Sequence, residues 1–266
     1  MRASEWIAAG YFVYLGLLAW LVRLPPGRRR RSVALVVPVL LLLWVSPRVG
    51  DAPLARTLRD WLPALYLLAG YALSGLFFVA PMPRVQRWLA ASDRRLFDAV
   101  DFPRLAARAP RALLETLEAA YVGTYALIPG ACLYLSLAGP PAAADRFWSL
   151  VLLAEFGAFG MLPWIQSRPP WAVEPAGALE RRGLLMRRLN GWIVRGVSHR
   201  ANTFPSGHVS GTLAAALAVA EWRPAAGALL GAAAACVASG AVVGRYHYTA
   251  DVVAGAALAV LVWALH

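Results

Sequence analysis

The stretch NTFPSGH, residues 202–208, stands between a long arginine-rich loop and an apolar run that begins at Val209. Its proline suits the first position of a helix, because the missing N–H would have no partner there. We therefore expect a helix to begin here, with Ser206 and Gly207 presenting open backbone N–H groups at its positive end, where anions bind. His208 follows on the first turn, where its imidazole can exchange protons with such an anion.

The chain around this stretch is too apolar for an ordinary soluble domain. It has 266 residues, 60% of them hydrophobic, and a mean hydropathy of +0.57, which is typical of a protein with several membrane spans. Its formal charge is +12, and all 26 basic residues are arginine. A nucleic-acid-binding protein can be as basic, but it does not place most of its length in apolar runs of about 20 residues. We expect a lipid bilayer, and no nucleic acid, as a partner.

Eight apolar segments are candidates for membrane spans. They run roughly over 5–22, 33–46, 61–80, 113–137, 147–165, 207–222, 225–243 and 246–265. The first lacks a cationic leader and a small-residue cleavage site, so we interpret it as a retained span. The sixth and seventh are short and rich in Ala and Gly, which lets helices approach closely, so we expect both in the interior. The sequence predicts an all-α, polytopic membrane bundle. Its two cysteines, Cys132 and Cys236, lie in apolar runs and indicate no disulfide or metal framework.

Three arginine-rich connections follow from these spans, over 23–32, 81–112 and 166–206. Apolar residues recur among the arginines of 81–112 and of 184–193, which predicts helices lying in the membrane interface. If the spans alternate, these connections and the 243–246 turn lie on one side, together with 20 of the 26 arginines. The positive-inside rule makes that side cytoplasmic and places both termini outside. A phosphate-binding surface is an alternative reason for part of the excess of arginine on this side.

The same alternation brings three distinctive segments to the arginine-rich side. They are QSRPP at 166–170, PSGH at 205–208 and GRYHYTAD at 244–251. In the third, His247 and Asp251 are spaced i, i+4, which on a helix places them on one side. A carboxylate there can hold one ring nitrogen and leave the other bare and more nucleophilic.

These residue types match the needs of phosphoryl transfer, which are a nucleophile, a cationic cradle and an acid. Arg168 and Arg245 offer planar guanidinium groups that fit phosphate oxygens, and His208 can serve as the acid. Structural alternatives remain for each: an interfacial arginine, a plain helix start, and a buried His247–Asp251 pair that joins two helices. A metal site made of the two histidines and the aspartate fits no zinc or di-iron spacing. We expect no cofactor.

The motifs carry a resemblance to a known family. PSGH followed by His247-x-x-x-Asp251 resembles the second and third signature motifs of the type-2 phosphatidic acid phosphatase superfamily, and Arg168-Pro169 resembles the end of its first. That family is a six-helix membrane bundle, related to vanadium haloperoxidases, which dephosphorylates lipid phosphates without metal. The resemblance covers roughly residues 113–265.

The resemblance also implies a role for each residue. His247 is implied to be the nucleophile that forms a phosphohistidine, Asp251 to orient it, and His208 to protonate the leaving alcohol. The residues implied to hold the phosphate are Arg168, Ser206 and Gly207.

Two positions depart from the family pattern. Met161 stands where the first motif has a Lys, and Ala241 stands where the third motif has an Arg. Arg245, two residues before His247, is the candidate replacement cation. The sequence GRYHY at residues 244–248 resembles that of a branch of the superfamily that includes inositol-phosphoceramide synthases. Those enzymes pass a phosphoryl group with its head group to a lipid alcohol.

From the sequence we therefore expect an N-terminal part, residues 1–112, with spans and an interfacial helix, and a catalytic phosphatase-like core, residues 113–266. The expected function is hydrolysis of a lipid phosphomonoester or diphosphate, of a polyprenyl or a glycerolipid, through a phosphohistidine. The alternatives are a lipid phosphotransferase and a non-catalytic transporter or binding protein for a phospholipid. The expected location is the bacterial inner membrane, with the site on its cytoplasmic side. The oligomeric state is left open.

Overall fold

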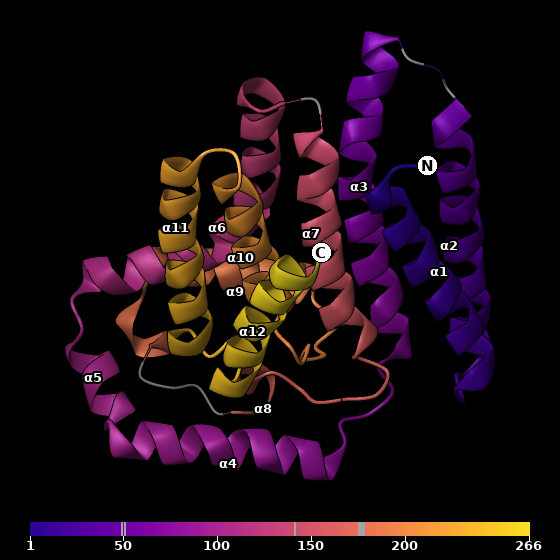
Figure 1. The fold of residues 1–266 in the computed structure, drawn as a ribbon. Coiled ribbons are helices and arrows are strands. Elements are labelled where there is room, and N and C mark those ends of the chain that lie inside the picture. The colour runs from indigo at the N-terminus through magenta and orange to yellow at the C-terminus, as the bar shows by residue number, and fades with distance from the viewer. Residues whose placement is uncertain (49, 51, 141, 175–178) are drawn as a thin grey trace.

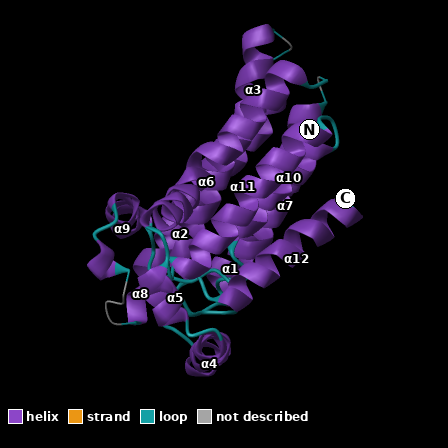
Figure 2. Cartoon of the chain, turned by 90° about the vertical axis from the view of Figure 1, so that its left-hand side faces the viewer, coloured by secondary structure: helices purple, strands orange, loops and turns teal. Residues whose placement is uncertain are grey.

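The computed structural model describes residues 1–48, 50, 52–140, 142–174 and 179–266. Within these ranges the protein consists of helices and loops without a strand (Figure 2), apart from an isolated bridge between Ser167 and Asn202. The expectation of an all-α, polytopic helical fold is therefore confirmed.

Eight helices correspond to the eight predicted spans and run along the bundle (Figure 1). They are α1 (Ala3–Leu21), α2 (Pro26–Val45), α3 (Pro53–Ser74), α6 (Arg111–Ala138), α7 (Ala143–Gly160), α10 (Gly207–Ala220), α11 (Pro224–Val243) and α12 (Thr249–Leu265). In length and hydropathy, α1, α2 with the 3₁₀ turn that follows it, α6 and α11 are suited to cross a membrane. The helices α10 and α12 are apolar but shorter.

Helix α7 is the centre of the bundle. It is apolar on all sides, as expected of a helix that neighbours cover completely, and 13 of its residues are buried. Its Phe156 and Phe159 belong to a core cluster with α1, α2 and α3. Its Trp148 and Val151 belong to a second cluster with α6, α10 and α12. Through α7, the three N-terminal helices are packed directly against the helices that carry the motifs.

Helices α10 and α11 differ in burial, although the sequence predicted both to be interior. Ala214 and Ala218 of α10 are fully buried, whereas Leu229 of α11 is 75% exposed. The small residues of α11 allow another helix to approach closely on one side of α11 only. A Cβ on Gly227 would lie 2.4 Å from the Cα of Ala220 in α10. The prediction was thus right for α10 and wrong for α11, because a small-residue pattern marks a contact and not complete burial.

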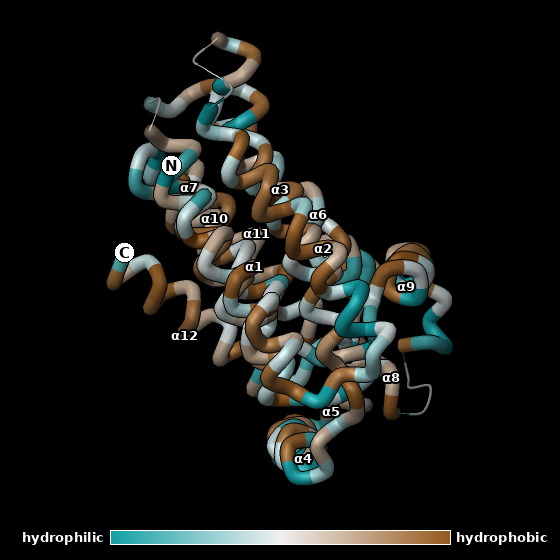
Figure 3. Tube along the Cα trace, turned by 90° about the vertical axis from the view of Figure 1, so that its right-hand side faces the viewer, coloured by the Kyte–Doolittle hydropathy of each residue, from teal (hydrophilic) through white to brown (hydrophobic). Residues whose placement is uncertain are grey.

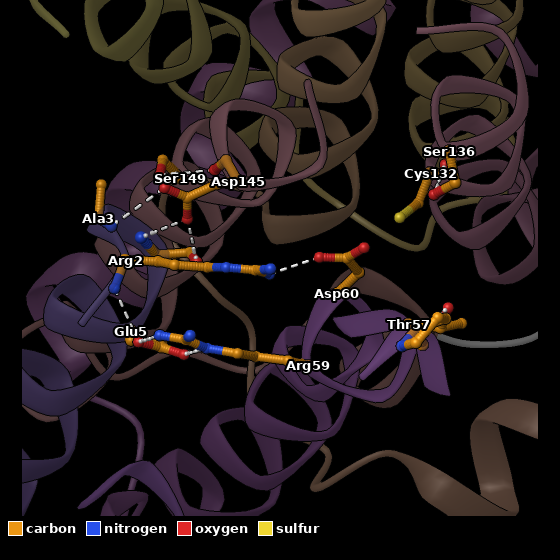
Figure 4. Close-up of polar contacts among 12 residues, drawn as sticks. Arg2, Ala3, Glu5, Thr57, Arg59, Asp60, Cys132, Ser136, Asp145 and Ser149 are labelled. Atoms are coloured by element: carbon orange, nitrogen blue, oxygen red, sulfur yellow. Dashed lines mark hydrogen bonds and ion pairs between the residues drawn. The ribbon is translucent and has the colours of Figure 1, made fainter. Parts of the chain in front are cut away.

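Polar contacts fasten the start of α1 to its neighbours at the end of the bundle away from the motifs (Figure 4). Arg2 pairs with Asp60 of α3, and Arg59 holds both carboxylate oxygens of Glu5 at 2.5 and 2.7 Å. Asp145 at the start of α7 accepts hydrogen bonds from the first N–H groups of α1 at 3.1 Å. These contacts hold α1, α3 and α7 in register.

The remaining helices lie at the opposite end. They are α4 (Pro83–Ala99), α5 (Phe102–Arg108), α8 (Pro170–Val173) and α9 (Leu185–Val197). Helix α4 runs across the end of the bundle (Figure 1), as an interfacial helix would. The single helix expected within 81–112 is broken at Asp101, whose φ of +45° is left-handed. In α9, Leu185 and Trp192 point outward, 63% and 70% exposed, while Asn190 is buried. Figure 3 shows this mixture of hydropathies along α4 and α9.

Candidate active site

The three motif segments meet where α7 ends and where α10 and α12 begin. The backbone N–H of Asn202 donates to the carbonyl of Ser167 (2.8 Å), and its side-chain amide donates to the Ser167 hydroxyl (3.1 Å). The N–H of Ser206 donates to the carbonyl of Asp251 (2.9 Å). The structure therefore brings together the segments that the alternation of spans placed on one side.

Two histidines lie next to one another at this junction. The ring centres of His208 and His247 are 5.7 Å apart, with their planes inclined by 59°. Tyr121 of α6 stacks on the His208 ring with a centre distance of 5.0 Å, and Tyr125 meets it edge-on at 5.8 Å. These tyrosines restrict the His208 ring, so that its edge stays close to His247.

Asp251 lies behind His247. Its Oδ2 is 3.5 Å from Nδ1 of His247, and it also accepts a hydrogen bond from the N–H of Tyr248 at 2.9 Å. This separation is too long for a well-formed hydrogen bond, and Nδ1 of His247 has no hydrogen-bond partner among the described residues. His247 precedes α12, and Asp251 lies on its first turn, so the pair spans a helix cap instead of one helix side. Within the described ranges, no group of three or more His, Cys, Asp or Glu residues is placed to hold a metal ion.

The start of α10 differs in detail from the expected anion site. Pro205 precedes the helix, Ser206 is its N-cap, and Gly207 is its first residue. The N–H of Ser206 is already bonded, and that of Gly207 lies 3.4 Å from the Thr203 hydroxyl, so these two groups are not open. The Ser206 hydroxyl, by contrast, is buried and has no partner among the described residues.

A side chain at Gly207 would clash with α7. A Cβ at this position would lie 2.7 Å from Cε1 of Phe159 and 2.8 Å from Oε2 of Glu155, both on α7. The absence of a side chain at Gly207 therefore lets α7 approach the start of α10 closely.

Arg168 is held at the end of the loop that follows α7. Its backbone N–H donates to Oε1 of Gln86 in α4 (2.8 Å), and Nε2 of Gln86 donates to the Tyr248 hydroxyl (2.6 Å). The Arg168 guanidinium lies over the ring of Phe78, 5.6 Å from its centre. One amide side chain of α4 thus connects the first motif with the third.

Arg245 lies apart from the other predicted phosphate ligands. Its Nη1 donates to Asp93 of α4 (2.7 Å), and its Nε and Nη2 donate to Glu174 (3.0 and 2.5 Å). It also stacks over Phe97, 4.5 Å from the ring centre. With its donors directed at two carboxylates, Arg245 ties the third motif to α4 and is not turned toward the two histidines.

The two positions that depart from the family pattern are both without a cation. Met161 follows α7 and is 38% exposed, whereas Ala241 is fully buried. Ala241 packs with Tyr121 and Tyr246, and its carbonyl accepts the N–H groups of Tyr246 and His247 at 2.9 and 3.0 Å. A long side chain has no room there, so any further positive charge must come from elsewhere.

Sequence reasoning missed a buried network around Glu118 of α6. This carboxylate accepts from the Tyr246 hydroxyl (2.6 Å), from Nη1 of Arg187 (2.7 Å) and from Nδ2 of Asn190 (2.7 Å). Arg187 also donates to the carbonyl of Gly244 (3.1 Å). The network holds α9 against the residues just before His247. An acidic residue inside an apolar span is itself a signal of function.

A second missed acid is Glu155 of α7. It is 5% exposed, and its Oε2 has no hydrogen-bond partner in the described part of the chain. Glu155 can pack against α10 because Gly211 has no side chain. A Cβ at Gly211 would lie 2.0 Å from Oε1 of Glu155. The hydroxyl of Thr124, on α6, is likewise buried and unpartnered among the described residues.

The loop before α10 is docked on the N-terminal helices through His199. Its ring stacks near Tyr71 of α3 with a centre distance of 4.7 Å. A Cβ on Gly75 would lie only 2.3 Å from this ring. Burial lowers the pKa of His199, which keeps the imidazole neutral at pH 7. His199 therefore acts as a packing group that places the second motif.

Two cavities open at the site. The apolar cavity, of about 720 Å³, is walled by α3, α6, α7 and α9 and contains His208, His247, Glu155 and Thr124 in its lining. The basic cavity, of about 530 Å³, lies between α9 and its flanking loops. Its arginines are Arg168, Arg187, Arg188, Arg195 and Arg200. The two cavities share Trp171, Val194 and Tyr246 as a common wall.

Comparison with known proteins gives one match. A model of the PAP2 superfamily matches residues 87–265, which includes all three motif segments and leaves α1, α2 and α3 outside. No curated protein and no solved structure matches the chain.

Proposed function

Because the chain belongs to the PAP2 superfamily, we propose that this membrane protein is a phosphatase of lipid phosphates that works through His247 and His208. The observation that carries the proposal is the position of the two rings, 5.7 Å apart in the wall of an apolar cavity. A cavity of about 720 Å³ with mostly apolar walls suits a lipid chain. Its two histidines would then meet the phosphate at the end of that chain.

In the first step, the Nε2 of His247 attacks phosphorus while the bond to the lipid oxygen breaks. Asp251 faces Nδ1 of the same ring, so it favours the tautomer with Nε2 bare and stabilises the charge that develops on the imidazole. His208, protonated beside the bound phosphate anion, gives its proton to the leaving oxygen. The products are the lipid alcohol and a phosphohistidine. A diphosphate substrate would instead leave as the lipid monophosphate.

In the second step, water resolves the intermediate. Neutral His208 takes a proton from the water as its oxygen attacks phosphorus, and the bond to Nε2 breaks to release inorganic phosphate. The Arg168 guanidinium and the Ser206 hydroxyl are the groups we assign to the phosphate oxygens. Arg245 has its donors on Asp93 and Glu174, so we assign it the task of holding α4 against the third motif.

We also propose how the protein is organised in the membrane. The arginine-rich end, with α4 and α9, would face the cytoplasm of a bacterial inner membrane and carry the site. Residues 1–112 would form the N-terminal part and residues 113–266 the catalytic core.

The direct test is phosphate release by the purified protein in detergent with EDTA present. The panel holds phosphatidic acid, undecaprenyl diphosphate and phosphatidylglycerol phosphate. We expect release from at least one of them and a fall in rate of about 10²–10⁴-fold in H208Q. In a single turnover that follows formation of the phosphohistidine, the loss should be smaller for p-nitrophenyl phosphate, whose leaving group needs no proton. Equal losses in this step on both kinds of substrate would contradict the acid role of His208, and no release of phosphate from a folded sample would contradict the phosphatase.

One observation favours a second function, transfer of the phosphoryl group to a lipid alcohol instead of water. Glu155 and Thr124 place unpartnered polar atoms inside an otherwise apolar cavity that also contains His208. A water-using phosphatase has no need of a hydrogen-bond acceptor there. A hydroxyl of an acceptor lipid could form a hydrogen bond with the Glu155 carboxyl group and so be held close to the phosphohistidine.

The E155L variant separates the two functions. If a lipid alcohol is the acceptor, we expect its phosphorylation to fall by about tenfold, since one hydrogen bond to the acceptor hydroxyl is lost. Release of inorganic phosphate should stay within about twofold. The measurement is product analysis with labelled substrate in the presence of diacylglycerol. Parallel loss of both products, or formation of phosphate alone in wild type, would argue against the transferase.

A further inference from the structure

We propose that the basic cavity binds a second phosphate-type group of the substrate, apart from the phosphate that reacts. The preferred substrate would then be a lipid with a phosphorylated head group or a diphosphate, and not a simple monoester. This inference rests on the proposed function, because it takes the two histidines as the place where the first phosphate reacts.

The charge of the basic cavity is the first argument. Five arginines line it, and its lining includes one carboxylate, that of Glu180. One of the five, Arg187, is already paired with Glu118 and Glu180. In the described ranges, no carboxylate contact is seen for Arg168, Arg188, Arg195 or Arg200. A cavity with so much uncompensated positive charge is suited to a multivalent anion.

The shape of α9 is the second argument. Arg188, Gly191 and Arg195 recur on one side of the helix, and all three line the cavity. Nη1 of Arg195 lies 3.2 Å from where a Cβ of Gly191 would be, so the guanidinium folds back across this glycine. Leu185 and Trp192 lie next to these arginines around the helix, since Trp192 follows Arg188 by four residues, and they are 63% and 70% exposed. The arginines therefore line the cavity beside exposed apolar side chains.

The position of the basic cavity is the third argument. It shares Tyr246 and Trp171 with the apolar cavity that contains His247, and Arg168 lines it as well. One molecule can therefore place its chain in the apolar cavity, a phosphate at the histidines and a second anionic group among the arginines.

The test combines binding and kinetics for the double variant R188Q/R195Q. The binding probe is inositol hexakisphosphate, followed by calorimetry on detergent-solubilised protein with H247A in the background, which prevents turnover. We expect the Kd to rise about 100-fold, or about tenfold for each arginine. In the active background, the KM for phosphatidylglycerol phosphate should rise similarly, whereas that for phosphatidic acid should stay within about twofold.

The matched control is R94Q/R95Q, which removes the same charge from exposed positions of α4 outside both cavities. Equal weakening in variant and control would mean general attraction to the arginine-rich end and would overturn the proposal. So would unchanged probe affinity in R188Q/R195Q. Loss of binding to phosphatidylglycerol vesicles, with the probe still bound, would assign the arginines to the membrane surface instead. If no lipid phosphate is hydrolysed, the proposed function fails, while the binding data still decide on the cavity.

Discussion

Replacing His247 with alanine is expected to abolish phosphate release from lipid substrates, with a fall in kcat on the order of 10⁴-fold or more. His247 is the nucleophile that we propose, because the Asp251 carboxylate lies 3.5 Å from its Nδ1 and the centre of the His208 ring is 5.7 Å from its own. Without it no phosphohistidine forms, and water would have to attack the lipid phosphate directly. The expected residual rate is that given by binding and positioning alone.

The measurement is single-turnover release from labelled substrate, together with acid-labile label retained on the protein. Wild type should show the label, and H247A should show none. H266A is the control, since it removes an exposed histidine at the end of the chain and should leave both readouts unchanged. Retained label in H247A with normal turnover would mean that another residue is the nucleophile.

A second large effect is expected at a residue to which we assign no contact with the substrate, in the variant G255A. Gly255 of α12 lies against the start of α10, and a Cβ there would be 2.6 Å from the carbonyl oxygen of Ser206. That oxygen belongs to backbone, so it cannot turn aside. The added methyl group must push α10 and α12 apart, and with them His208 and His247. We expect a loss of about 1–3 kcal/mol in stability and a fall in kcat of about 10²-fold, as a displacement of about 1 Å produces.

The matched control for this variant is G231A on α11, where a Cβ would meet no atom within 4 Å. That change should leave activity intact and should raise thermal stability slightly, because alanine favours helix over glycine. Thermal unfolding in detergent and phosphate release are measured on both proteins. Full activity in G255A would show that the spacing of α10 and α12 does not limit the reaction.

The arrangement of the helices was predictable because hydropathy is a local signal. All eight predicted spans appear as helices, and the alternation of sides brought Arg168, Ser206 and His247 to one end of the bundle. Boundaries were less accurate where polar residues continue a helix. Helix α2 begins at Pro26, so the arginines at 28–31 form its first turns instead of a loop. The break at Asp101 depends on a left-handed residue, which no hydropathy pattern reveals.

The site was predictable in its histidines but not in its supporting contacts. His208, His247 and Asp251 stand in short motifs, whereas Glu118 meets Arg187 and Tyr246 across 69 and 128 residues of sequence. Such pairings follow from tertiary packing. Arg245 is a residue for which closeness in sequence gave a wrong prediction. Its closeness to His247 in sequence suggested a phosphate ligand, but a left-handed backbone turn and two distant carboxylates direct it to α4.

The apolar cavity takes one wall from α3, through Ala64, Leu67, Leu68 and Tyr71, although α3 lies outside the part of the chain that matches the family. The wall of this cavity is therefore built partly by residues that the family model does not cover. Under the function that we propose, substitutions in α3 would change the space for the lipid chain without altering a group assigned to the phosphate.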